Sequence, residues 1–193
     1  MKKYIVLLFA VIFLVPCVAG ADSTDRCEMI EFVELFTQRI TQYQDQKNVD
    51  FKMLPGAYSS PLVREGILIF ESAAGSISVR TDDYTVHEVI ITLANSNDNQ
   101  SKYEERLICA SAAISALEAN ASADYMAKAM GSSAMDMAQI IMYEIIGNQF
   151  QDSVNKALSE NTRIKVYEGN YSYFIKCQTI DDLLIVYLVA REH

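Results

Sequence analysis

Two groups of three short apolar segments constrain the fold of this 193-residue chain more than any other feature. The first group runs over 63–94 and the second over 163–190. Within each group the connections are short turns that contain glycine or paired aspartates, which favours antiparallel hairpins over the long crossovers that parallel strands need. The sequence therefore predicts two antiparallel β meanders.

Helical patterns occupy the segments before the first meander and between the two. Apolar residues recur there at intervals of three and four, and Asp25 with Glu28 resembles a capping box. The last of these segments is apolar nearly all round in its first half, and Gly147 is a weak point inside it. Helices are predicted over 25–47, 101–118, 122–130 and 132–158.

This order of elements predicts an α+β domain. We expect about six to seven strands in one or two antiparallel sheets, with three to four helices packed mainly on one face. Each meander also contains a pair of turn-forming aspartates before its last strand, Asp82-Asp83 and Asp181-Asp182. Asp83 and Asp182 lie 99 positions apart, which suggests an αβββ pseudo-repeat.

The first 21 residues have the pattern of an export signal. Two lysines precede the apolar run Tyr4–Val15, and small residues close the segment. We expect cleavage after Ala21, a single domain over 22–193, a secreted, periplasmic or cell-surface location, and no membrane association after cleavage. An uncleaved anchor and lipidation at Cys17 are the alternatives.

Composition excludes several classes of protein. The chain is 51% hydrophobic with a net charge of −9, and removal of the first 21 residues takes away two lysines and leaves −11. Such a chain is too apolar to be disordered and too acidic to suit nucleic acid. It contains no recognisable zinc, phosphate-loop or dinucleotide motif, so we assign no cofactor, no metal and no catalytic residue.

Three cysteines remain after the expected cleavage, Cys27, Cys109 and Cys177. An odd number permits at most one intramolecular disulfide. Two interpretations stay open: three free thiols, or one bridge, for which Cys109–Cys177 is the favoured pair.

Candidate binding residues are aromatic side chains and methionines. Tyr171 and Tyr173 share one face of a strand and form a docking surface if that face is open, or core if helices cover it. Met126 and Met130 share one helical face and offer an adaptable contact surface. The apolar helix over 134–146 is a candidate homodimer interface.

His87 is the only interior histidine, and strict strand alternation places it on the same face as Val89. A structural role is favoured, because no acid–base partner lies at a recognisable spacing. The sequence thus predicts an exported, non-enzymatic α+β module that binds a protein or a small ligand. The alternative is a small exported hydrolase with a dispersed active site around His87.

Overall fold

The computed structural model describes residues 27–47, 54–55, 66–72, 75–119, 134–147 and 149–193. The export signal, its cleavage after Ala21 and Cys17 lie outside these ranges. So do the helix expected over 122–130 and both candidate methionines, Met126 and Met130.

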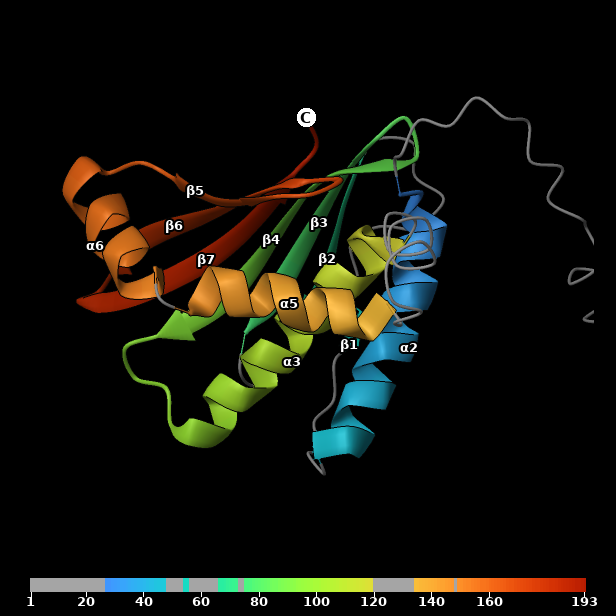
Figure 1. Cartoon of the computed structure of the whole chain (residues 1–193), viewed down its shortest axis with the longest axis horizontal. Helices are drawn as coiled ribbons and strands as arrows, with labels where there is room; N and C mark the ends of the chain where they lie inside the picture. The colour runs from blue at the N-terminus through green and yellow to red at the C-terminus, as the bar shows by residue number, and fades with distance from the viewer. Residues whose placement is uncertain (1–26, 48–53, 56–65, 73–74, 120–133, 148) are drawn as a thin grey trace, which may run out of the picture.

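One antiparallel sheet of seven strands forms the framework, in the order β1-β2-β3-β4-β7-β6-β5 (Figure 1). β4 and β7 pair at its centre, and each expected meander extends outward from that pair. The strands are β1 (Leu54–Pro55), β2 (Gly66–Glu71), β3 (Ser76–Asp82), β4 (Thr85–Asn95), β5 (Ile164–Glu168), β6 (Ser172–Ile180) and β7 (Leu183–Arg191). The α+β class and the antiparallel meanders are confirmed.

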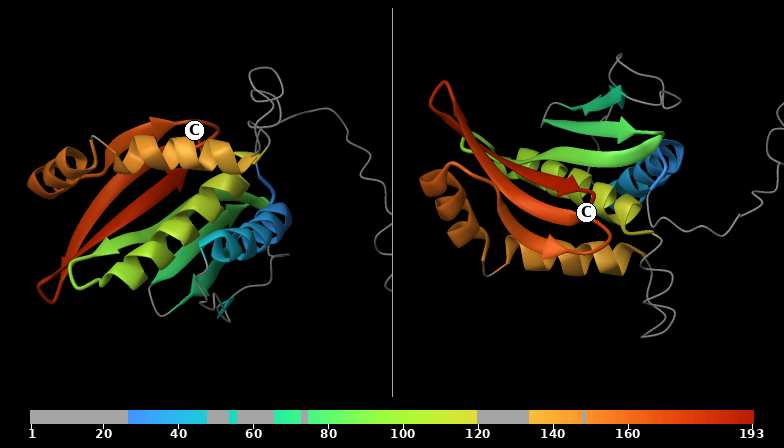
Figure 2. Two further views of the ribbon diagram at one scale, coloured as in Figure 1. Left: turned by 60° about the horizontal axis from the view of Figure 1, so that its bottom comes forward. Right: turned by 90° about the horizontal axis from the view of Figure 1, so that it is seen from above.

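The described helices lie on one side of the sheet (Figures 1 and 2). They are α2 (Met29–Lys47), α3 (Gln100–Leu117), α5 (Ala134–Ile146) and α6 (Phe150–Glu160). α3 packs against β4 and contacts both α2 and α5, whereas α6 packs on β6 at the far end of the sheet. Asn99 starts α3 by accepting a hydrogen bond from the Lys102 N–H.

The hydrophobic core fills the space between these helices and the sheet. Two adjacent cross-strand rows point into it, and every member is at most 4% exposed. They are Leu68, Val79, Val89, Ala190 and Tyr173, and then Phe70, Ile77, Ile91, Leu188 and Ile175. From the helical side, Phe36 packs against Phe70 with ring centroids 5.0 Å apart. Burial of one face of each strand therefore fixes the register.

The prediction of a single helix over 132–158 is wrong. The structure has two helices, α5 and α6, which are separated at Gly147. An added Cβ at Gly147 would overlap the backbone oxygen of Tyr143, so the chain approaches itself there more closely than any other residue permits. The break lets α5 pack on α3 while α6 packs on β6.

The turn before the last strand of each meander has the same backbone conformation in both halves. The two turns align one residue away from the expected pairing of Asp83 with Asp182. Asp83 and Tyr84 have φ values of 49° and 67°, and Asp181 and Asp182 have 48° and 63°. Positive φ at both central residues is typical of the two-residue hairpin turn whose twist matches the flanking strands. Asp83 therefore corresponds to Asp181 rather than to Asp182, and Asp82 belongs to β3.

Candidate functional site

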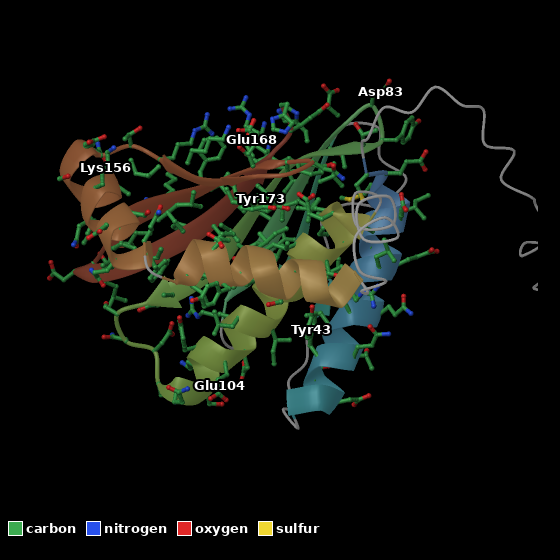
Figure 3. All side chains as sticks on the ribbon, viewed as in Figure 1. Tyr43, Asp83, Glu104, Lys156, Glu168 and Tyr173 are labelled. Carbon is green, nitrogen blue, oxygen red and sulfur yellow. The ribbon has the colours of Figure 1, made fainter. Side chains whose placement is uncertain are left out.

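Tyr171 and Tyr173 lie in the core. Their exposed fractions are 1% and 0%, because the helices cover the face of the sheet on which both side chains lie. Figure 3 shows Tyr173 between the sheet and α5. The interpretation of these tyrosines as an open docking surface is wrong, and the alternative, that they are core, holds.

A buried carboxylate holds this tyrosine pair in place. Glu118 directly follows α3 and accepts three hydrogen bonds, from the Tyr173 hydroxyl (2.9 Å), the Asn170 N–H (3.0 Å) and the Tyr171 N–H (3.3 Å). Burial, with Glu118 beside it, raises the pKa of Tyr173 well above its usual value. The cluster ties the β5–β6 hairpin to the end of α3, and its carboxylate is already committed to three donors.

A second buried contact joins the beginning of the described chain to the same strands. The Tyr171 hydroxyl donates to the Val86 carbonyl at 2.9 Å and accepts from the Cys27 N–H at 3.4 Å. The Val86 N–H in turn donates to the Cys27 carbonyl at 2.8 Å, so residues 27–29 run alongside the start of β4. Burial and nearby Glu31 raise the pKa of the Cys27 thiol to about 12, which leaves it protonated and unreactive.

All three described cysteines are free thiols. Cys109 lies on α3, and burial raises its pKa to about 12. Cys177 lies on β6, where its Sγ faces the Val154 carbonyl of α6 at 3.8 Å. The favoured bridge between Cys109 and Cys177 is therefore absent, and the open choice resolves to three thiols.

His87 does not share the face of Val89. The β3–β4 pairing shifts by one residue at this point, since Arg80 pairs with Glu88 but Thr81 pairs with Val86. His87 is the extra residue of the bulge, so Val86 takes the buried position and the imidazole is partly exposed. Its Nδ1 lies 3.2 Å from Oε2 of Glu192.

One side of helix α5, the candidate dimer interface, is already buried by packing within the chain. Ala138, Ile141, Met142 and Ile145 are buried. Tyr143, in contrast, is 67% exposed and borders a groove of about 770 Å³ between α2, α3 and α5. Homodimerisation through 134–146 stays a prediction.

The second face of the sheet is not covered by any described helix, as the view from above shows (Figure 2). One cross-strand row lies on it between the two buried rows described above: Ile69, Ser78, Ile90, Val189 and Phe174. Ile69, Ile90 and Phe174 are partly exposed, and Val189 is closed over by its neighbours. We call this row and the strand side chains around it the open sheet face.

The net charge of the open sheet face is opposite in sign to that of the whole chain. It carries five basic side chains, Arg80, Arg163, Lys165, Lys176 and Arg191, against four acidic ones, Glu71, Asp82, Glu88 and Glu168. The chain as a whole has 16 basic and 25 acidic residues. The Arg163 guanidinium lies over the Phe174 ring, 4.9 Å from its centroid, and so joins the basic and apolar parts of the face.

Within the described ranges, no group of three or more histidine, cysteine, aspartate or glutamate side chains is arranged to hold a metal ion. None of the described helices is long and apolar enough to cross a membrane. Comparison with family models, with curated proteins and with solved structures finds no match.

Sequence reasoning missed both the Glu118 cluster and the open sheet face. Glu118 is separated from its hydrogen-bond partners by more than 50 residues, so no local pattern reports the contact. The open face had a signal in Ile90 and Phe174, apolar residues that alternate with buried ones along their strands. That signal was readable only once the order of the strands was known.

Proposed function

We propose that the protein is an exported, non-enzymatic binding module that docks an acidic protein on its open sheet face. One observation carries the proposal: a partly exposed apolar row crosses the centre of that face, and basic side chains flank it. Apolar contacts provide affinity at the centre of an interface, and surrounding charges provide orientation and selectivity.

The charge distribution favours an acidic partner over a second copy of this chain. Two copies of a face with five basic and four acidic side chains gain no net attraction from their charges. The chain as a whole is acidic, so an acidic partner meets a surplus of basic side chains on this face rather than on the protein in general. Long-range attraction of this kind steers docking to a single orientation.

A charge reversal on the face tests the proposal. The protein is immobilised and incubated at low salt with the proteins exported by the cells that produce it. Any protein that it retains is purified, and its affinity is measured by titration. We expect the retained protein to be acidic, and Lys176→Glu to weaken its binding about tenfold, since an attraction becomes a repulsion. Binding should also weaken as salt is raised, because exposed charges are screened.

Lys102→Glu is the matched control. Lys102 is exposed on α3, on the side of the sheet opposite the open face. The same charge change there should leave the affinity unchanged. Equal losses in Lys176→Glu and Lys102→Glu, full binding by a Phe174→Ala variant, or retention of no protein at low salt would each refute docking on this face.

The second candidate function, a small hydrolase around His87, is supported by the Nδ1–Oε2 contact with Glu192. A carboxylate can orient an imidazole for proton transfer. His87 borders none of the cavities described for this structure, which is why we rank this function second. Assay of ester and amide substrates with the native protein and with His87→Ala tests it: activity that survives the substitution contradicts the role.

A further inference from the structure

A cavity of about 330 Å³ lies on the open sheet face, where β4, β7 and β6 meet the connection between α6 and β5. Ile90 and Val189 give it apolar wall, and they are neighbours in the row that crosses the centre of this face. Its other lining residues are Glu88, Asn161, Thr162, Arg163, Lys176 and Cys177. The cavity therefore joins the apolar row to a group of polar and charged side chains.

Two cations line this cavity side by side. Ile164 pairs with Ile175, so Arg163 and Lys176 are the next residues along their two segments, and both are exposed to solvent. Like charges in neighbouring positions on one face of a sheet repel each other. Among the described residues, no carboxylate forms an ion pair with either of these two cations. Such a pair favours an anion that comes from outside the chain.

The charges that line the cavity indicate how strongly that anion is charged. Arg163 and Lys176 contribute two positive charges and Glu88 contributes one negative charge, so the lining has a net charge of +1. Glu88 is also engaged by Arg80, whose Nη1 lies 3.4 Å from Oε1 of Glu88. One carboxylate balances this lining, whereas a phosphate group with nearly two charges exceeds it.

The cationic side of the cavity is held in place by contacts within the chain. The Arg163 guanidinium lies over the Phe174 ring, 4.9 Å from its centroid. Asn161 ends α6 with a φ of 47°, and the N–H groups of Asn161 and Thr162 both donate to the Ala157 carbonyl. A binding group that is already ordered loses less conformational freedom when its ligand arrives.

We propose that this cavity binds the carboxyl terminus of the acidic partner, with an apolar side chain on the partner's last residue. The α-carboxylate lies between Arg163 and Lys176, and the Thr162 hydroxyl adds a donor beside it. The apolar side chain packs on Ile90 and Val189. The assignment rests on the docking of an acidic protein on the open sheet face.

A chain terminus fits this cavity better than an internal acidic residue. In a C-terminal residue, the carboxylate and the apolar side chain are attached to the same Cα, so both enter one small cavity together. An internal aspartate or glutamate carries no apolar side chain of its own, and its direct neighbours in an extended chain point to the opposite side.

Titration of the ¹⁵N-labelled protein with synthetic peptides, followed by NMR, tests the proposal. The probe is the peptide acetyl-Asp-Glu-Ser-Leu with a free carboxyl terminus, and its C-terminal amide is the matched control. We expect the free acid to shift the amide signals of Thr162, Arg163 and Lys176 saturably, and the amide to bind about tenfold more weakly because it lacks the charged acceptor. Equal affinities of the two peptides, or no shift of these signals, would overturn the proposal.

A peptide that ends in serine instead of leucine tests the apolar wall. It keeps the terminal carboxylate but buries less apolar surface, so we expect an affinity about tenfold lower than that of the leucine peptide. Equal affinities of these two free acids would contradict the packing on Ile90 and Val189.

Lys176→Gln should raise the dissociation constant of the free-acid peptide several-fold, because one of the two cations is removed. Lys156→Gln is the matched control: Lys156 is exposed on α6 and is not among the residues that line the cavity (Figure 3). Its affinity should equal that of the native protein, and a parallel loss in both variants would place the binding elsewhere.

The peptide titration needs no partner protein, so its outcome is separate from the retention of an acidic protein. If the free acid and the amide bind equally while an acidic protein is still retained at low salt, recognition of the terminus is refuted and docking on the face stands.

Discussion

The two faces of one sheet differ although the same strands form both. On the helix-covered face, ten residues in two cross-strand rows are nearly inaccessible, and the buried Glu118 carboxylate is paired with three donors. On the open face, alternate residues of those strands remain partly exposed and basic side chains surround them. The two-residue period of a strand thus separates stability from recognition, since each side chain serves only one face.

Alkaline pH should expose the largest difference between the faces. Burial on the covered side raises the pKa values of Cys27 and Cys109 to about 12, and raises those of Tyr171 and Tyr173 above their usual value. The unfolded chain releases these protons from about pH 9 for the thiols and about pH 10 for the phenols, whereas the folded chain keeps them. The unfolded state then binds fewer protons, so stability is intact below about pH 9 and falls as pH rises toward 12.

Urea unfolding at pH 8, 9, 10 and 11 measures this effect. Each group contributes at most about 1.4 kcal/mol per pH unit, so the four together should lower the free energy of unfolding by several kcal/mol. Cys27→Ala should flatten the decline between pH 9 and 11. An unchanged free energy of unfolding across this range would contradict the burial of these groups.

Adjacent isoleucines in β4 offer a matched test of the same comparison. Ile91 is buried on the covered face and Ile90 is partly exposed on the open face. We expect Ile91→Ala to cost about 2–5 kcal/mol, because it leaves a cavity in the core, and Ile90→Ala to cost about 1 kcal/mol or less. Chemical denaturation of both variants gives the two values, and similar values would mean that the open face is covered in solution.

The sequence predicted the positions of the strands and helices better than the contacts between them. Periodicity placed every described strand apart from β1 to within a few residues, because burial of one face imposes alternation. It placed His87 on the wrong face, since one bulge residue reverses the parity and leaves no local sign. It extended one helix through Gly147, because a single glycine weakens a helix without necessarily ending it, whereas the structure separates α5 from α6 there.

The candidate sites depend on contacts between distant parts of the chain, which is why the sequence did not reveal them. Glu118 at the end of α3 meets Asn170 only after the second meander forms, and the row of the open sheet face exists only after the two meanders pair. Tyr171 and Tyr173 were correctly placed on a common face, but which face the helices cover is decided by packing across the whole domain.

Two tyrosines in neighbouring strands provide the finest test of the difference between the faces. Tyr173 donates to Glu118 inside the core, whereas Tyr187 is partly exposed on the open face. We expect Tyr173→Phe to lower the free energy of unfolding by about 1–2 kcal/mol, because a buried carboxylate oxygen loses a donor that water cannot replace. Tyr187→Phe should change it by less than about 0.5 kcal/mol, since solvent reaches that part of the surface. Denaturant melts of both variants measure the two differences, and a larger loss in Tyr187→Phe would reverse the assignment of the faces.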